Sequence, residues 1–254
     1  MTSSPAIPAM VWLRSWLYLV FFLVWTVFSA IFLLPTLITP RWTLHGIRFW
    51  IGGIMVLARV IAGITCRVMG LEHVPPGACI IAAEHQSSFE TYRLFMDLEH
   101  PIFILKRELT WIPFIGWYMT RAGFVAIDRG AGAGAMRKML RATQVALEAG
   151  HQVVVFPEGT RVPFGEKRPY QPGIAALYNQ CDVPMIPMAL NTGYFWGKTR
   201  ILKIPGEIIF RFMPALPRGL DRDGLLATLR TTFEAADSRL DSAGDEPLRK
   251  NKAH

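Results

Sequence analysis

The sequence is short of charge and of cysteine. Charged residues make up 18% of the 254 residues, whereas hydrophobic residues make up 52%. A water-soluble globular protein normally carries about 25% charged residues, so the composition argues against an ordinary soluble enzyme. The three cysteines, Cys66, Cys79 and Cys181, are isolated and odd in number. We expect them to be reduced, buried thiols on the cytosolic side of a membrane, because a disulfide framework needs an even set.

Charge is absent altogether from residues 15–40. About 20 apolar residues cross a hydrocarbon core as a helix, so we expect a membrane-anchoring helical segment here. Trp12, Trp16 and Trp42 near its ends fit the aromatic belt of a membrane interface. A cleaved signal peptide fits less well, because the apolar block is too long and Arg14 is the only charge before it.

A second apolar block, residues 49–64, is short and is interrupted by an arginine. These properties favour a helix at the membrane surface, or a re-entrant helix, over a second complete span. Such an arrangement also keeps Arg41, His45 and Arg48 on the cytoplasmic side, as the positive-inside rule requires. We therefore expect residues 1–68 to form membrane-associated helices, with the rest of the chain on the cytoplasmic face.

Positive charge is in excess: 27 Lys and Arg stand against 19 Asp and Glu, a formal net charge of +8. This excess suits an anionic membrane surface or an anionic substrate. Nucleic acid is not expected as a partner, because zinc-ligand spacings, glycine-rich RNA motifs and long basic runs are absent from the sequence. No metal or organic cofactor is expected either, because the acids and histidines are not at ligand spacing.

Strand and helix patterns alternate through residues 69–240. A helical pattern at residues 135–149 is closed by Gly150, and another at residues 222–240 follows a possible N-cap at Asp221. The alternation predicts an α/β fold with a largely parallel sheet flanked by helices. The tail, residues 241–254, is charged and is expected to be flexible. Apolar runs predict strands at residues 80–83, 102–105, 123–127, 152–156, 185–190 and 207–212.

The clearest chemical signal lies just after the first of these strands. His85 follows the apolar run, and Glu90 begins the next helical pattern, so both should lie at the carboxyl edge of the sheet, where α/β sheets bind ligands. A neutral imidazole there can take a proton from an alcohol, and a carboxylate can orient it. Glu90 also fits a capping box with Ser87, so it could instead satisfy the helix start. The absence of a Gly-x-Ser-x-Gly motif argues against the covalent route of hydrolases.

Four motifs occur in order along the chain, and together they resemble the 1-acylglycerol-3-phosphate acyltransferase (lysophosphatidate acyltransferase) family of glycerolipid acyltransferases. The likeness covers about residues 70–216. One residue departs from the family pattern, because the first motif usually ends in Asp and here ends in Glu90. The motifs are His85-Gln86-Ser87-Ser88-Phe89-Glu90, then Lys106-Arg107-Glu108-Leu109 continuing to Arg129, then Phe156-Pro157-Glu158-Gly159-Thr160-Arg161, and Val183-Pro184-Met185-Ile186-Pro187.

The resemblance implies an acyltransferase of phospholipid biosynthesis. His85 would be the general base that deprotonates the sn-2 hydroxyl of lysophosphatidic acid, and Glu90 would orient it. The acyl donor would be a thioester of coenzyme A or of an acyl carrier protein, and the product would be phosphatidic acid. Arg161 would contact the glycerol phosphate, and Pro187 would lie near the acyl channel. The full set of implied substrate-binding residues is Lys106, Arg129, Glu158, Gly159, Thr160, Arg161 and Pro187.

Elementary chemistry supports part of this assignment. The planar guanidinium of Arg161 matches phosphate oxygens in pairs, and Gly159 allows backbone N–H groups to approach an anion closely. Pro187, by contrast, is also typical of an edge strand or a bulge. Three other functions remain open: acylation of another lysolipid or a lyso-amino-acid lipid, hydrolysis of the thioester, and non-catalytic binding of anionic lipids.

Overall fold

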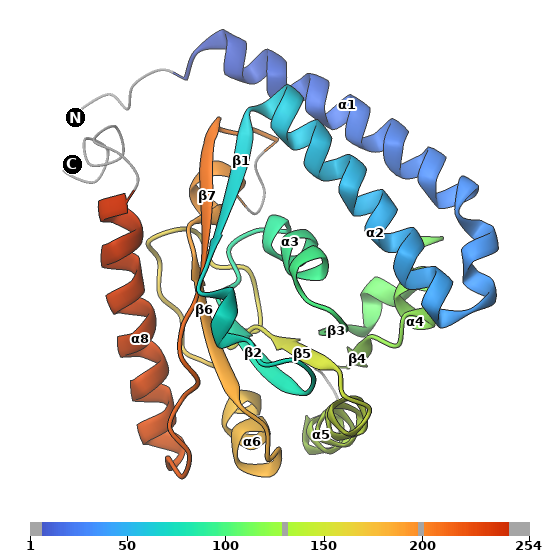
Figure 1. Ribbon diagram of the computed structural model, residues 1–254. Helices are drawn as coiled ribbons and strands as arrows, with labels where there is room; N and C mark the ends of the chain where they lie inside the picture. Colours follow the sequence, from blue (N-terminus) through green and yellow to red (C-terminus); the bar gives the residue numbers. More distant parts are fainter. Residues whose placement is uncertain (1–6, 129–131, 198–200, 244–254) are drawn as a thin grey trace.

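The protein is an α/β domain with a long helical hairpin at its N-terminus (Figure 1). A computed structural model describes residues 7–128, 132–197 and 201–243. Its helices are α1 (Ala9–Phe32), η1 (Leu34–Ile38), α2 (Pro40–Leu57), η2 (Ala58–Ala62), η3 (Leu71–His73), α3 (Phe89–Asp97), η4 (Arg107–Trp111), α4 (Ile115–Arg121), α5 (Gly132–Glu148), α6 (Gly173–Gln180), α7 (Thr192–Phe195) and α8 (Arg222–Ala243). Its strands are β1 (Ile64–Met69), β2 (Cys79–Ala83), β3 (Pro101–Lys106), β4 (Val125–Ile127), β5 (Gln152–Val155), β6 (Met185–Leu190) and β7 (Gly206–Phe212).

The strands form one seven-stranded sheet in the order β1-β7-β6-β2-β5-β3-β4. Strands β2 to β6 all run parallel to one another, so the prediction of a largely parallel sheet is confirmed. Strand β7 instead pairs antiparallel with β6, and β1 runs parallel to β7 at the edge. Parallel sheets are buried on both faces, which explains why their strands are continuous apolar runs.

Strand β1 was not among the predicted strands, and it lies before the expected start of the α/β region at residue 69. The sheet therefore begins at Ile64. The reason is its position at the edge, because Thr65 and Arg67 are exposed there and interrupt the apolar run. Arg67 forms an ion pair with Glu207 of β7 at 2.9 Å, which is a polar pairing suited to an exposed edge.

Two apolar cores lie on opposite faces of the sheet. On β2, Ile81 and Ala83 contribute to the core under the hairpin, α3 and α4, whereas Ile80 and Ala82 contribute to the core under α5, α6 and α8. This division follows from the two-residue repeat of a strand. The predicted helix ends are also present: Gly150 follows α5 with φ 81°, and Asp221 Oδ1 accepts a hydrogen bond from the Gly224 N–H at 2.8 Å.

The hairpin of α1 and α2 contains two helices that are each long and apolar enough to cross a membrane. The second is longer than the apolar block at residues 49–64 suggested, because it begins at Pro40 after a Thr39 cap and continues through a π-helical turn to Ala62. The Trp25 ring of α1 packs directly against Gly53 of α2, in the space that a Cβ atom at position 53 would occupy. The Trp25 Nε1–H also donates a hydrogen bond to the Trp50 carbonyl at 2.8 Å. The glycine therefore allows the two helices to pack closely.

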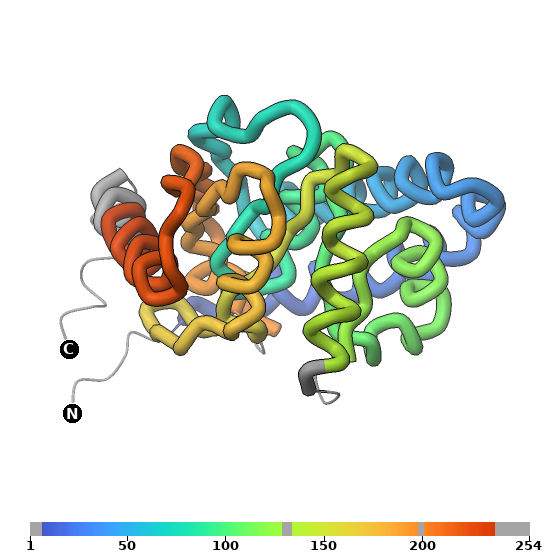
Figure 2. The backbone as a smooth tube through the Cα atoms, turned by 90° about the horizontal axis from the view of Figure 1, so that it is seen from below, coloured from blue at the N-terminus to red at the C-terminus, as the bar shows by residue number. Residues whose placement is uncertain are grey.

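The hairpin lies along the α/β domain instead of projecting from it. Arg48 of α2 donates hydrogen bonds to the Leu98 and Glu99 carbonyls at the end of α3, at 3.0 and 2.7 Å. At the turn of the hairpin, the Tyr118 hydroxyl of α4 donates to the Ala30 carbonyl. Figures 1 and 2 both show this turn beside α4.

Candidate active site

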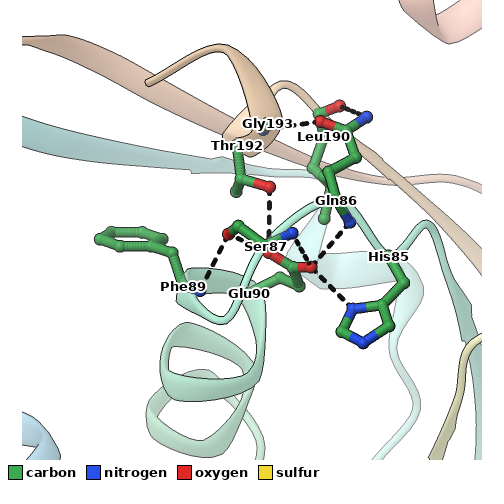
Figure 3. A network of polar contacts seen from close by, with 8 residues as sticks. All are labelled: His85, Gln86, Ser87, Phe89, Glu90, Leu190, Thr192 and Gly193. Atoms are coloured by element: carbon green, nitrogen blue, oxygen red, sulfur yellow. Dashed lines mark hydrogen bonds and ion pairs between the residues drawn. The ribbon is translucent and has the colours of Figure 1, made fainter. Parts of the chain in front are cut away.

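His85 and Glu90 meet at the carboxyl end of β2, as the sequence predicted. His85 lies in the turn after β2, and Glu90 lies in the first turn of α3. His85 Nδ1 is 2.8 Å from Glu90 Oε1 (Figure 3), and the Glu90 side chain is 0% exposed. A carboxylate can only accept, so Nδ1 carries the proton and Nε2 has a free lone pair. The pair can therefore act as an oriented general base.

The Glu90 carboxylate accepts four further hydrogen bonds. Oε1 accepts from the backbone N–H groups of Gln86 and Ser87 at 2.8 and 2.6 Å. Oε2 accepts from the Ser87 hydroxyl at 2.6 Å and from the Thr192 hydroxyl at 2.9 Å. Ser87 Oγ in turn accepts from the Phe89 N–H, so Glu90 both supports the helix start and contacts the histidine.

Thr192 and Gln86 were not predicted as site residues. Thr192 follows β6, which neighbours β2 in the sheet, and its side chain is fully buried. Gln86 Nε2 donates to the Leu190 carbonyl, and its Oε1 accepts from the Gly193 N–H, at 2.8 and 2.9 Å (Figure 3). The turns after β2 and β6 meet because these two parallel strands are neighbours and end at the same edge, an adjacency that the sequence does not show.

Phe156 holds the other side of the imidazole. Its ring stacks on His85 with centroids 3.9 Å apart and planes at 17°. The Val162 N–H donates to the His85 carbonyl at 2.7 Å, which joins the histidine turn to the loop after β5. The third motif thus contributes an aromatic platform beside its charged residues, and the imidazole is fixed on two sides.

His85 and Arg161 open into one cavity of about 330 Å³. The cavity lies on the hairpin face of the sheet. A largely apolar wall next to a base and a guanidinium suits a lipid that carries an anionic headgroup. Its apolar lining comes from both hairpin helices, α3, η4 and α4, and includes Ala30, Leu33, Ile47, Trp50, Ile51, Phe95, Phe103, Leu109, Ile112, Ile115 and Phe124.

Glu158 lies on the opposite side of this turn. Its carboxyl is buried, and it lines a second, more polar cavity of about 450 Å³ together with Glu84, Lys167 and Arg230. Burial raises the pKa of Glu158 to about 7; backbone hydrogen bonds lower it, whereas the charge of Glu90 adds to the rise. Oε2 has no hydrogen-bond partner among the residues that the structure describes. The structure thus places Glu158 behind the histidine turn, away from the cavity of Arg161.

Gly159 and Thr160 complete the turn between Glu158 and Arg161. Gly159 has φ 67°, and a Cβ there would stand 2.8 Å from Gln171 Cγ, so the turn requires glycine. Thr160 is half-buried. The tight turn directs two successive charged residues, Glu158 and Arg161, to different cavities.

Known proteins resemble this chain in sequence and in fold. A family model described as Acyltransferase matches residues 65–191. The 1-acyl-sn-glycerol-3-phosphate acyltransferase of Pseudomonas aeruginosa is 35% identical over 74% of this chain and 74% of its own length. The chain belongs to the 1-acyl-sn-glycerol-3-phosphate acyltransferase family. The mouse 1-acyl-sn-glycerol-3-phosphate acyltransferase alpha is 29% identical over 80% of this chain and 73% of its own length.

This acyltransferase also has the fold of a solved structure. The 1-acyl-sn-glycerophosphate (LPA) acyltransferase PlsC of Thermotoga maritima superposes with a TM-score of 0.72, covering 91% of this chain and 97% of the other. The two sequences are 21% identical. The superposition covers 91% of the chain, which must include part of the N-terminal hairpin. The likeness in fold therefore extends well beyond the motif region.

Two further candidate residues of this acyltransferase, Lys106 and Pro187, are not among the residues that line the cavity of His85. Lys106 is exposed at the end of β3. Among the described residues, it lines neither the cavity of His85 nor that of Glu158. Arg129 lies outside the described residues. Pro187 is buried in β6, between β2 and β7, and its carbonyl accepts from the Met213 N–H at 3.0 Å. The interpretation of Pro187 as an edge residue is therefore wrong. Pairing of β6 with β7 begins only at Met188, so the missing N–H of the proline costs no bond on that side.

Metal-ligating side chains do not gather anywhere in residues 7–128, 132–197 and 201–243. No group of three or more His, Cys, Asp and Glu is placed to hold an ion there. The chemistry that these residues can offer is that of a base, a hydrogen-bonded carboxylate and a guanidinium.

Proposed function

We propose that this enzyme transfers a fatty acyl group from a thioester to the sn-2 hydroxyl of 1-acylglycerol-3-phosphate and produces phosphatidic acid. The relative from Pseudomonas aeruginosa carries that activity in its name. The observation that carries the proposal is the single apolar cavity into which His85 and Arg161 both open. Such a cavity can hold the acyl chain, the phosphate and the reacting hydroxyl of one lipid at the same time.

The reaction needs one base and no covalent enzyme intermediate. His85 Nε2 takes the hydroxyl proton while the oxygen attacks the thioester carbonyl, and Glu90 stabilises the imidazolium that forms. The C–S bond then breaks, the new C–O ester bond remains, and the histidine returns the proton to the departing thiolate. We propose that no metal or organic cofactor takes part, because the thioester of coenzyme A or acyl carrier protein is already activated.

We further propose that the hairpin lies in the plane of the cytoplasmic leaflet. Arg48 ties α2 to the end of α3, and Tyr118 ties α4 to the turn of the hairpin. A hairpin upright in the bilayer would draw α4 toward the hydrocarbon together with its exposed Arg121, at a high cost in free energy. A hairpin in the plane places the cavity at the depth of the lipid headgroups.

An acceptor panel tests the proposed function. Purified full-length enzyme with acyl-CoA, and separately with acyl carrier protein thioester, should release thiol only when lysophosphatidic acid is added. Release of thiol without an acceptor would indicate a thioesterase. Faster release with another lysolipid would show that the acceptor carries a different headgroup. An absence of release from either donor, with intact lipid binding, would indicate a non-catalytic protein.

Arg161→Lys tests the phosphate contact. The substitution keeps the positive charge but removes the planar guanidinium that can pair with two phosphate oxygens. It should therefore raise the KM for lysophosphatidic acid and leave the KM for the donor unchanged. The loss in kcat/KM should be about 1.5–3 kcal/mol, the range of a hydrogen bond to a charged group. Arg168→Lys, on an exposed residue of the second cavity, is the matched control. Equal effects of Arg161→Lys on both substrates would remove Arg161 from the acceptor site.

A further inference from the structure

The segment that follows β3 exposes a group of large apolar side chains at the protein surface. Within η4 and α4, Trp111 is 65% exposed and Trp117 is 52% exposed, and Leu109 and Ile112 are exposed beside them. Tryptophan side chains normally bury most of their large surface. An exposed cluster of this kind marks a surface that contacts something apolar.

This surface is continuous with the turn of the hairpin. The Tyr118 hydroxyl donates to the Ala30 carbonyl at 3.2 Å, and Arg121 Nε donates to the Leu37 carbonyl at 2.9 Å. Both views of the backbone show α4 beside the turn (Figures 1 and 2). The turn itself exposes Ile31, Phe32, Ile38 and Trp42. The hairpin and the η4–α4 segment therefore present apolar side chains side by side.

The η4–α4 segment is held in a fixed shape. A Cβ on Gly116 would stand 2.0 Å from the Thr110 carbonyl oxygen, so α4 can pack on η4 only because that residue is glycine. Phe114 between them adopts φ 62°, which a bulky residue rarely adopts, and its ring lies 5.0 Å from that of Trp117. The two tryptophans are thus presented at defined positions.

Lysine and arginine side chains lie near the two tryptophans, with the exposed Glu108 among them. The Arg107 guanidinium lies 5.5 Å from the Trp111 ring centroid and pairs with Asp128, and Lys106 and Arg121 are exposed nearby in sequence. Tryptophan next to arginine and lysine is the composition of proteins at the headgroup region of anionic leaflets. A second copy of this chain would bring the same cations together, which disfavours a protein partner with this surface.

The η4–α4 segment also forms one wall of the reaction cavity. Leu109 and Ile112 are exposed at the surface and line the cavity that holds His85. We propose that Trp111 and Trp117 insert into the headgroup region of the leaflet that holds the hairpin, so that a lipid acceptor enters the cavity across the rim formed by Leu109 and Ile112. This inference rests on the proposed function.

Depth-dependent fluorescence in vesicles tests the insertion. A polarity-sensitive dye is attached to full-length protein carrying Trp117→Cys in a Cys66→Ser background, in phosphatidylglycerol–phosphatidylethanolamine vesicles. Matched controls are Val145→Cys on α5, which is 60% exposed on the other face, and Val27→Cys on α1, also 60% exposed. Spin-labelled lipids should quench the dye at positions 27 and 117 and should leave position 145 unquenched.

The three positions separate the two proposals. Quenching at 27 without quenching at 117 would overturn the η4–α4 contact and leave the hairpin in the membrane. Absence of quenching at 27 would overturn the membrane location itself. Phosphatidylcholine vesicles are a further comparison, and quenching at 117 should be weaker there because the neutral surface does not attract the cations.

Kinetics provide a second, independent test. The double variant Trp111→Ser, Trp117→Ser should lower kcat/KM about tenfold for lysophosphatidic acid embedded in vesicles, because two interfacial side chains are lost. It should leave kcat/KM within twofold for a short-chain, monomeric lysophosphatidic acid. Val145→Ser should leave both values unchanged. An unchanged value on vesicles would overturn the proposal.

Discussion

Glu90 is the residue that both supports the start of α3 and holds the His85 imidazole. One carboxylate oxygen accepts from His85 and from two backbone N–H groups, and the other accepts from two hydroxyls. A carboxylate is suited to this position because it accepts at both oxygens. The longer glutamate reaches from the first turn of α3 to all five donors, so the departure from the family's usual aspartate is accommodated.

Glu90→Gln should lower kcat about 100-fold and leave thermal unfolding nearly unchanged. The backbone N–H groups of Gln86 and Ser87 can only donate, so the amide oxygen must face them and His85 keeps its tautomer. What is lost is the negative charge that stabilises the imidazolium. Steady-state kinetics beside calorimetry check this expectation. If the variant has the melting temperature and the kcat of the parent enzyme, Glu90 has a capping role alone.

Thr192→Val should lower kcat about five- to tenfold, whereas Thr192→Ser should retain most activity. Valine fills the same space but removes the hydroxyl that holds Glu90 Oε2, which is worth about 1–1.5 kcal/mol. A purely structural role would change the melting temperature without changing kcat at low temperature. The ratio of kcat between the serine and valine variants therefore separates positioning from packing.

Glu158→Gln should make the free energy of unfolding less dependent on pH between about 4.5 and 7. The folded enzyme keeps the proton on Glu158 up to about pH 7, whereas the unfolded chain loses it near 4.5. The folded state thus binds more protons in this range, and its stability falls as pH rises, by at most about 3 kcal/mol. Denaturant unfolding at pH 5 and pH 8 measures the difference. An identical pH dependence in parent and variant would contradict the raised pKa.

At the scale of elements, Arg48 couples the hairpin to α3. Its guanidinium donates to the Leu98 and Glu99 carbonyls just after α3 and lies 5.9 Å from the Phe95 ring centroid. Arg48→Met keeps the apolar stem and removes the donors, so it should cost about 1–2 kcal/mol and lower the melting temperature by a few degrees. Arg41→Met, on an exposed arginine of the same helix, is the control and should have little effect. Equal effects of the two substitutions would mean that Arg48 does not tie α2 to α3.

The sequence was sufficient to predict the buried parallel strands and the turn that carries His85. Those strands are continuous apolar runs because both of their faces are covered. It did not predict β1, since an edge strand exposes alternate residues, nor the antiparallel direction of β7, which depends on a long connection. Thr192 and Phe156 were not predicted because their roles depend on which strands are neighbours in the sheet. The different cavities of Glu158 and Arg161 depend on the path of one glycine turn, which composition and spacing do not show.

At the scale of the whole molecule, the proposed placement of the hairpin sets where the candidate active site lies relative to lipid. Its two helices have the composition of membrane spans, yet they pack along the domain through Arg48 and Tyr118. An enzyme whose acceptor and product are both lipids gains from this placement, because the substrate need not leave the leaflet. High salt or carbonate should leave the full-length protein in the membrane fraction, since the contact is apolar.

Labelling from the two sides of a membrane distinguishes a hairpin in the plane from a hairpin that spans. Arg41 and Arg59 are exposed arginines near opposite ends of the second helix. Eighteen residues of helix separate them by about 27 Å, close to the thickness of the hydrocarbon core. If the hairpin lies in the plane, Arg41→Cys and Arg59→Cys, each in a Cys66→Ser background, should react with an impermeant maleimide from the same side of sealed vesicles. That side should be the cytoplasmic one, where Val145→Cys also reacts. Reaction of position 41 from the opposite side only would show that the helices cross the bilayer, and the in-plane placement of the cavity would then be wrong.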